Sequence, residues 1–242
     1  MNGFLIIKNF IHLCMIFNKN LALQTAKHLL QINAIKLNLE NPFTWASGWK
    51  SPIYCDNRII LSYPKIRSHL SDIISKKIAQ EHSDPLIIAG VATGAIGISM
   101  LVADKLKLPF IYNRPEPKKH GQKNQIEGHL NSKLPVLVIE DLISTGKSSL
   151  NAVNSIKNAG ANVIGMVALF TYGFEMAEKA FIKANVNVKT LCDYEHLLSV
   201  AESEGEISAF QKERLKTWRK DPVSYTHLRA HETRGNLVCR LL

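Results

Sequence analysis

The sequence has few cysteines, and none are paired at a spacing typical of metal binding or redox chemistry. Its 242 residues include four cysteines, scattered at Cys14, Cys55, Cys192 and Cys239 with no C-x-x-C pair. This spacing argues against a zinc site and against the disulfide framework of a small secreted domain, and it suits a reducing compartment. We therefore expect a cytoplasmic protein.

The sequence also lacks a hydrophobic run long enough to cross a membrane. Its apolar N-terminal stretch, residues 4–17, is shorter than a membrane span and is interrupted by Lys8 and His12. No basic segment precedes it and no small-residue cleavage motif follows, which argues against a signal peptide. A good amphipathic pattern begins only behind Met15. We therefore predict no membrane association and expect residues 1–14 to be a non-native or disordered extension.

No long run of one charge sign, internal repeat or low-complexity linker is present. The net charge of +10 comes from 30 basic and 20 acidic residues spread along the chain. Such a charge is compatible with nucleic acid or phosphorylated small molecules, but without a basic stripe we predict no nucleic-acid partner. The last residues, 223–242, show neither a strand nor a helix period and follow a natural helix end at Asp221–Pro222. We expect them to be an unstructured appendage and residues 15–222 to form the folded domain.

What the chain does contain is an alternation of short apolar runs with helical patterns. With 46% hydrophobic and 21% charged residues, its composition is that of an ordinary globular protein. We expect strands at 86–91, 109–114, 136–139, 162–170 and 188–193, and a polar loop over 114–133. Helices are expected near 18–38, over 63–82, after the turns that follow two of the strands, and over 194–202 and 206–219. This order predicts βαβ units, and hence an α/β fold with a mostly parallel sheet flanked by helices.

One stretch, VLVIEDLISTG at residues 136–146, has the pattern of a ligand site. An apolar strand runs into Glu140 and Asp141, and small residues then lead into a helix that Gly160 is placed to stop. Ligands of open α/β sheets bind at the carboxyl ends of strands, where the N–H groups of Ser144–Gly146 can face an anion. An ordinary strand-to-helix turn with a helix cap would look similar. However, two acids at a buried strand end are costly without a partner, which favours a cation or a polyhydroxyl ligand.

Residues 136–148, VLVIEDLISTGKS, resemble the phosphoribosyl diphosphate (PRPP) binding motif of type I phosphoribosyltransferases. The segments FTWASGWKSPIY (43–54) and NRPEPKKHGQKNQIEG (113–128) narrow this resemblance to the orotate phosphoribosyltransferases, over roughly residues 18–222. The resemblance implies a type I phosphoribosyltransferase fold, with a mostly parallel twisted sheet and a small N-terminal hood. It also implies an enzyme of pyrimidine (UMP) biosynthesis that converts PRPP and orotate to orotidine 5′-monophosphate and diphosphate, with Mg²⁺.

The resemblance also implies roles for individual residues. Glu140 and Asp141 would hold the ribose hydroxyls, while no side chain would bind Mg²⁺ directly. The 5′-phosphate would be wrapped by Leu142, Ile143, Ser144, Thr145, Gly146, Lys147 and Ser148, and Ser144 would also contact orotate. A second turn after a strand, GVATG at 90–94, would hold the diphosphate through Ala92, Thr93 and Gly94, with a non-proline cis peptide between Ala92 and Thr93. Glycine-rich turns of this kind are common, so this turn is weak support by itself.

The basic segment from Arg114 to Gly128 is long for a loop without secondary structure. A solvated basic loop is the ordinary interpretation of such a cluster, but its length favours a functional lid. By resemblance, Arg114, Lys118 and His120 would bind diphosphate, and the lid would close over the neighbouring subunit's site in a homodimer. Lys118, His120 and Asp141 are therefore the expected catalytic residues.

Four positions depart from patterns found in some members of the family. Ala46 and Gly94 replace lysines, Pro115 replaces a second lysine beside the arginine, and Tyr172 replaces an arginine that helps to hold orotate. We interpret these as subfamily features, and Lys50 could supply one missing charge. Two alternatives keep the fold: a phosphoribosyltransferase for a purine base, and a PRPP-binding regulator without catalysis. The hood segment argues against the first, and the basic lid without a preceding helix-turn-helix argues against the second.

Overall fold

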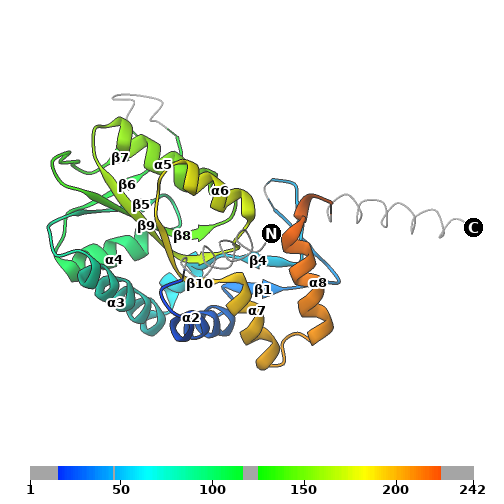
Figure 1. The fold of residues 1–242 in the computed structure, drawn as a ribbon. Helices are drawn as coiled ribbons and strands as arrows, with labels where there is room; N and C mark the ends of the chain where they lie inside the picture. Colours follow the sequence, from blue (N-terminus) through cyan, green and yellow to red (C-terminus); the bar gives the residue numbers. More distant parts are fainter. Residues whose placement is uncertain (1–15, 46, 117–124, 225–242) are drawn as a thin grey trace, which may run out of the picture.

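A six-stranded sheet forms the centre of the molecule, for which a computed structural model describes residues 16–45, 47–116 and 125–224 (Figure 1). The predicted extension 1–14, Ala46, Lys118, His120 and residues 225–242 lie outside the described residues. In sheet order the strands are β10 (Val188–Asp193), β9 (Val163–Thr171), β8 (Val136–Ile143), β5 (Ile87–Val91), β6 (Phe110–Asn113) and β7 (Ile126–Glu127). All neighbours pair in parallel except β6 and β7. The predicted α/β fold with a mostly parallel sheet is therefore confirmed.

Helices cover both faces of this sheet (Figure 1). One face carries α5 (Lys147–Asn158) and α6 (Glu175–Lys183), and the other carries α2 (Lys19–Gln31), α3 (Pro64–Glu81) and α4 (Ile96–Leu106). The chain ends in α7 (Tyr194–Ser203) and α8 (Ala209–Lys220). The helices expected over 63–82, 194–202 and 206–219 are confirmed, whereas α6 was not predicted. Within the described part of the chain, no helix has the length and apolarity that a membrane span requires.

The hood consists of two small antiparallel pairs near the carboxyl ends of the central strands, where Trp45 packs against Tyr172, the residue after β9. β1 (Ile35–Leu37) pairs with β4 (Ile53–Cys55), and β2 (Phe43–Thr44) pairs with β3 (Lys50–Ser51). The predicted helix over 18–38 is wrong at its end, because α2 stops at Gln31 and residues 35–37 form β1 instead. Asn33 causes the change of direction: its φ of 55° is left-handed, a conformation that asparagine tolerates and that ends helices.

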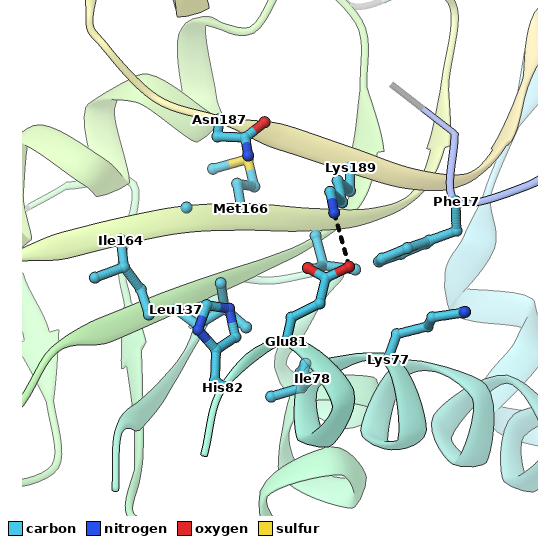
Figure 2. Close-up of a pocket in the computed structure, with 12 residues that line it drawn as sticks. Phe17, Lys77, Ile78, Glu81, His82, Leu137, Ile164, Met166, Asn187 and Lys189 are labelled. Atoms are coloured by element: carbon cyan, nitrogen blue, oxygen red, sulfur yellow. Dashed lines mark hydrogen bonds and ion pairs between the residues drawn. The ribbon is translucent and has the colours of Figure 1, made fainter. Parts of the chain in front are cut away.

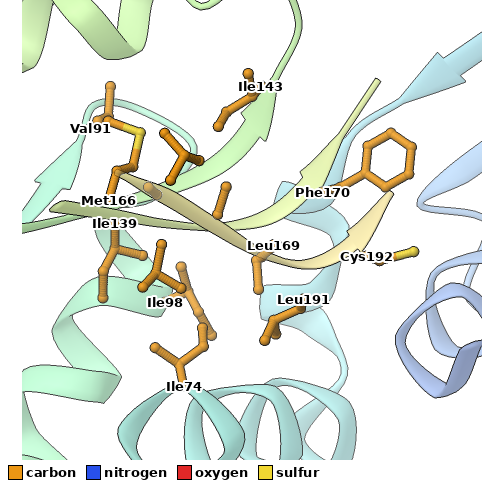
Figure 3. Packing of buried hydrophobic residues seen from close by; sticks show 14 of the residues in the cluster. Ile74, Val91, Ile98, Ile139, Ile143, Met166, Leu169, Phe170, Leu191 and Cys192 are labelled. Carbon is orange, nitrogen blue, oxygen red and sulfur yellow. The ribbon is translucent and has the colours of Figure 1, made fainter. Parts of the chain in front are cut away.

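The main core lies between the sheet and the helices on its two faces (Figure 3). Ile74 of α3 and Ile98 of α4 pack beneath the strands, where Ile139 of β8 and Leu169 of β9 are fully or almost fully buried. Because these central strands are covered on both faces, they read as continuous apolar runs rather than as an alternating pattern. This is why the strand before the two acids is visible in the sequence.

Both ends of the predicted folded domain make specific contacts. Ile16 forms a parallel bridge with Thr190 of the edge strand β10, whose carbonyl accepts a hydrogen bond of 3.1 Å from the N–H of Phe17. Trp218 of α8 is 1% exposed, and its indole N–H donates to the Lys50 carbonyl of the hood at 3.2 Å. The folded unit thus reaches from residue 16 to at least Trp218.

We expect a chain trimmed to residues 15–222 to fold and react like the full chain. Trimming leaves the Ile16 bridge, the Phe17 hydrogen bond and the buried Trp218 in place, so the melting temperature should change by no more than about 2 °C. Thermal melts and turnover of the full chain, 15–242, 1–222 and 15–222 would be compared. A large loss of melting temperature in 1–222 alone would show that residues 223–242 belong to the fold.

Candidate active site

The two acids lie within strand β8 rather than after it. We expected the strand to stop at Ile139, but it continues to Ile143 because β9 goes on pairing with it, with Glu140 opposite Ala168. On the opposite edge of β8, pairing with β5 stops one residue before the acids, at the pair of Gly90 and Ile139. The acids therefore lie where the β5 side of the strand is left open, at the carboxyl end of the sheet.

A cavity of about 320 Å³ lies beside the acids. Its walls come from three segments: the junction of β4 with the 3-10 helix η1 (Asn57–Ser62), the turn after β5, and the end of β8 with the start of α5. The lining residues are Cys55, Asp56, Arg58, Ala92, Thr93, Gly94, Glu140, Asp141, Leu142 and Ser148. The structure thus brings both acids, the turn at 92–94 and part of the 142–148 loop to one place, as the sequence predicted.

The carboxylates of Glu140 and Asp141 are in a poorly solvated environment. Glu140 is 3% exposed, and its Oε2 accepts a hydrogen bond of 2.7 Å from the Ser149 hydroxyl. Burial raises the pKa of Glu140 well above its usual range, and the neighbouring Asp141 adds to this effect. Burial also raises the pKa of Asp141, against the opposing charge of Arg58. Buried acids of this kind favour a ligand that brings positive charge or hydroxyl donors.

We expect Glu140→Gln to stabilise the ligand-free protein at neutral and alkaline pH. Because the folded-state pKa of Glu140 lies above its unfolded value of 4.5, the folded state binds the extra proton. The stability of the wild type therefore falls as pH rises from about 4.5 through the folded-state pKa, with a slope of up to about 1.4 kcal/mol per pH unit. Glutamine carries no charge and can still bond to Ser149. The melting temperatures of the wild type and Glu140→Gln should be similar near pH 4 and should differ increasingly up to about pH 8. A constant difference over this range would contradict the raised pKa of Glu140.

The loop after β8 leads directly into helix α5. Gly146, with φ of 78°, is the N-cap residue, and a Cβ there would press on the ring of Phe181 of α6 at 3.0 Å. The first N–H groups of a helix have no partner within the helix, so this loop can offer donors to a phosphate. Leu142 and Ser148 line the cavity, whereas the predicted loop residues Ile143, Ser144, Thr145, Gly146 and Lys147 lie between them in sequence and outside the lining.

The turn after β5 is held tightly against the acids. The peptide bond between Ala92 and Thr93 is cis, as the family resemblance implied. The N–H of Ala92 donates to the Asn113 carbonyl of β6 at 2.9 Å, which ties the turn to the sheet. Gly94 approaches Asp141 so closely that a Cβ at this position would overlap its carboxylate. Glycine is therefore required at position 94 while Asp141 occupies this place.

Other predicted residues do not reach this cavity. Arg114 does not line it, and its Nη1 lies 3.4 Å from Oε1 of Glu127. Lys50 donates to the hydroxyl of Thr44 at 2.8 Å within the hood. Tyr172 is 1% exposed and packs against aromatic rings that include Trp45 of the hood, with ring centroids 5.1 Å apart. The structure thus places Tyr172 in an aromatic cluster.

Sequence reasoning missed the acid–base pair at the start of η1. The guanidinium of Arg58 forms two bonds with Asp56, from Nε to Oδ1 at 2.6 Å and from Nη2 to Oδ2 at 2.7 Å. Hydrogen bonding to Arg58 lowers the pKa of Asp56. Between them, Asn57 donates from Nδ2 to the Asp141 carbonyl at 2.6 Å and so fixes η1 on β8. The signal in the sequence is the run Asp-Asn-Arg at residues 56–58, directly after strand β4.

A smaller hollow of about 70 Å³ lies at the opposite end of the strands (Figure 2). It is lined near the beginnings of β8, β9 and β10, by Leu137, Ile164 and Lys189 among others. Lys189 forms an ion pair of 2.7 Å with Glu81 at this hollow. Because ligands of open α/β sheets bind at the carboxyl ends of the strands, the cavity beside Glu140 and Asp141 is the candidate active site.

Comparisons with known proteins identify the family of this chain. A family model described as the phosphoribosyl transferase domain matches residues 57–195. The orotate phosphoribosyltransferase of Porphyromonas gingivalis is 52% identical over 207 residues, which cover 86% of this chain and 99% of the relative. That of Bacteroides fragilis is 53% identical over 207 residues, with 86% and 98% covered. The crystal structure of orotate phosphoribosyltransferase from Aeropyrum pernix superimposes with a TM-score of 0.65 at 27% identity, covering 76% of this chain and 99% of that one. The chain has the type I phosphoribosyltransferase fold, and it belongs to the orotate phosphoribosyltransferases of the phosphoribosyl transferase domain family.

Proposed function

We propose that this protein is an enzyme of pyrimidine biosynthesis that transfers the 5-phosphoribosyl group from PRPP to orotate. The products are orotidine 5′-monophosphate and diphosphate. The observation that carries this proposal is a single cavity that combines the paired acids Glu140 and Asp141, the turn at Ala92–Gly94 and the start of α5. The identity of about one half to curated orotate phosphoribosyltransferases, over most of both chains, supports the choice of base.

The reaction breaks the bond from ribose C1 to the diphosphate oxygen and forms a bond from C1 to the orotate nitrogen. The transition state has oxocarbenium character, so positive charge develops on the ribose while negative charge grows on the diphosphate. Glu140 and Asp141 would accept hydrogen bonds from the ribose hydroxyls, and charged acceptors make such bonds strong. Their negative charge beside the ribose also favours the developing cation. No covalent nucleophile is needed, so the main task of the protein is to hold three groups in line.

The two ends of PRPP would be held by the two turns that line the cavity. The loop from Leu142 to Ser148 is suited to the 5′-phosphate because it supplies hydroxyl groups and leads into the start of α5. One of these hydroxyls, that of Ser144, would also contact orotate. The turn at Ala92, Thr93 and Gly94 lines the same cavity and would hold the diphosphate. Its small residues let a charged group approach the backbone N–H groups closely.

Mg²⁺ fits this donor set as an ion that accompanies the diphosphate. Among residues 16–45, 47–116 and 125–224, no three His, Cys, Asp or Glu side chains cluster as a protein-made metal site would require. The buried carboxylates of Glu140 and Asp141, with their raised pKa values, would nevertheless gain from a cation nearby. Magnesium is commonly held by substrate phosphates, water and one or two carboxylates. When bound, it would supply positive charge to the diphosphate.

We further propose a homodimer in which each subunit's lid, with Arg114, Lys118 and His120, completes the partner's site. Exposed apolar side chains support a protein partner: Leu61 within η1, Tyr63 directly after it, and Met100 on α4. Leu61 packs over Gly97, which lies on α4 three residues before Met100, and exposed apolar patches commonly mark interfaces. A cytoplasmic location suits the two described cysteines, Cys55 and Cys192, which are unpaired thiols.

Release of diphosphate from PRPP in the presence of orotate tests the proposed function. We expect release to require orotate, PRPP and Mg²⁺, and to yield orotidine 5′-monophosphate. Adenine, guanine and hypoxanthine serve as competing bases in parallel reactions. Release with a purine base but not with orotate would identify a purine phosphoribosyltransferase, and PRPP binding without turnover of any base would identify a regulator.

A further inference from the structure

The lining of the active-site cavity is unbalanced in charge. Asp56, Glu140 and Asp141 contribute carboxylates, while Arg58 is the one basic side chain among the lining residues in the described part of the chain. A diphosphate group adds more negative charge to this cavity when PRPP binds. The cavity therefore needs cationic groups, and Arg58 is already in place.

The turn at 92–94 carries no cation of its own. A side chain on Gly94 would overlap the carboxylate of Asp141, and Ala92 and Thr93 are uncharged. A positive charge for a group bound at this turn must therefore come from another wall of the cavity or from the lid. Arg58 lies in the wall formed by the start of η1 and lines the same cavity as all three turn residues.

Arg58 is fixed in a geometry that suits anion binding. Its Nε and Nη2 bond to the two carboxylate oxygens of Asp56 at 2.6 and 2.7 Å, and Nη1 has no partner among the described residues. Asp56 is held in turn by its own backbone N–H, which donates to the Ala34 carbonyl of the hood at 2.7 Å. When a carboxylate holds a guanidinium through two parallel hydrogen bonds, the remaining N–H donors of the guanidinium are fixed in the same plane. Little side-chain entropy is then lost when these donors bind a phosphate.

Two contacts relate Arg58 to the acids that would hold the ribose. Asn57, its neighbour on η1, donates to the backbone carbonyl of Asp141 at 2.6 Å, so the position of Arg58 is coupled to that of β8. The charge of Arg58 also acts on the Asp141 carboxyl, where it opposes the rise in pKa that burial causes. Arg58 is thus close to the place where ribose C1 and its leaving group would lie.

We infer that Arg58, oriented by Asp56, binds the diphosphate group of PRPP and stabilises it as it departs. This inference rests on the proposed function. The other anionic groups of the reaction are the 5′-phosphate and the orotate carboxylate. The 5′-phosphate has its own donors in the loop that leads into α5, of which only Leu142 and Ser148 line the cavity of Arg58. All three residues of the turn at Ala92–Gly94 line that cavity. Arg58 is therefore placed as a leaving-group residue rather than a 5′-phosphate residue, and binding of orotidine 5′-monophosphate, which carries the orotate carboxylate, separates it from a base-recognition residue.

The test compares Arg58→Gln with the matched control Arg67→Gln. Arg67 loses the same charge on the neighbouring helix α3, where it donates to the Leu61 carbonyl and does not line the cavity. Binding of diphosphate, PRPP and orotidine 5′-monophosphate is titrated by calorimetry with Mg²⁺ present. In Arg58→Gln, affinity for diphosphate and PRPP should fall on the order of tenfold to a hundredfold, the range expected for a charged hydrogen bond. Affinity for orotidine 5′-monophosphate, which has no diphosphate, should stay within about twofold.

The pattern of loss distinguishes this inference from its competitors. Arg58→Lys keeps the positive charge but cannot form the paired hydrogen bonds of a guanidinium. Its affinity for diphosphate should therefore lie between those of the wild type and Arg58→Gln. Equal losses for diphosphate and orotidine 5′-monophosphate, or affinities equal to those of Arg67→Gln, would overturn the inference. A wild-type protein that binds neither PRPP nor the nucleotide would instead remove the proposed function. The turnover number should fall together with PRPP affinity, because charge on the diphosphate grows in the transition state.

Discussion

Asp141→Asn will lose most PRPP binding and turnover while it keeps the fold. Asp141 lines the cavity from strand β8, which pairs with β5 as far as Ile139 and with β9 as far as Ile143. Its backbone position therefore does not depend on its charge. An amide can accept a hydrogen bond from a ribose hydroxyl, but more weakly than a carboxylate does. PRPP affinity should fall by at least about tenfold, and kcat/KM by more, because the charge also favours the developing cation. Calorimetry with PRPP and steady-state kinetics measure the two losses.

Asp104→Asn is the matched control for this experiment. Asp104 lies on α4 outside the cavity and forms an exposed ion pair with Lys107 at 3.0 Å, so its neutralisation should leave PRPP binding and turnover unchanged. Circular dichroism and melting temperature establish that both variants are folded. The buried site even favours the neutral amide, so the melting temperature of Asp141→Asn should not fall. A variant with wild-type PRPP affinity and rate would remove Asp141 from the ribose site.

Mixing Lys118→Ala with Asp141→Asn will restore activity that neither variant has alone. Lys118 lies outside the described residues, and its expected role across a dimer comes from the family resemblance. In a heterodimer, one site carries both lesions. The other combines an intact Asp141 with an intact lid from the partner. About half of the activity of each heterodimer should therefore return, scaled by the fraction of heterodimers formed.

A mixture of Lys118→Ala with His120→Ala is the control for subunit exchange. Both lesions lie in the lid, so every heterodimer site receives a damaged lid and no activity should return. Subunit exchange is confirmed independently by capture of a tagged subunit. If exchange occurs and Lys118→Ala with Asp141→Asn gives no more activity than the two parents, the lid closes over its own subunit or the lysine has no role.

Secondary structure could be predicted from the sequence where the local residue pattern and the burial in the folded protein favour the same element. The strand before Glu140 was readable because residues 136–139 are buried on both faces. The continuation of β8 through Glu140 and Asp141 was not, because acids are poor strand formers and only pairing with β9 keeps them in the strand. The short helix α6 was missed because it offers few buried positions, mainly Ala177 and Phe181.

The candidate site was predicted where one continuous motif contains it and missed where distant segments meet. The acids and the turn at 92–94 belong to strand-end patterns that can be recognised locally. Arg58 and Asp56 reach the same cavity only because β4 of the hood turns into η1, and Asn57 then bonds to the Asp141 carbonyl. Nothing local in residues 56–58 indicates that contact, since its partner lies far along the chain.

The contact between Gly94 and Asp141 limits the order in which this site can change during evolution or engineering. The family resemblance places a lysine at position 94 in some members, yet here any side chain at that position would meet the Asp141 carboxylate. A lysine introduced alone must displace the acid that would hold the ribose, so the single substitution should be harmful even though its charge is favourable. Interconversion of the two designs therefore requires the turn and the end of β8 to change together. Asp141 belongs to the motif that carries the family resemblance, so a lysine at position 94 should be accommodated by a shift of the turn or of the Asp141 carboxylate rather than by loss of the acid.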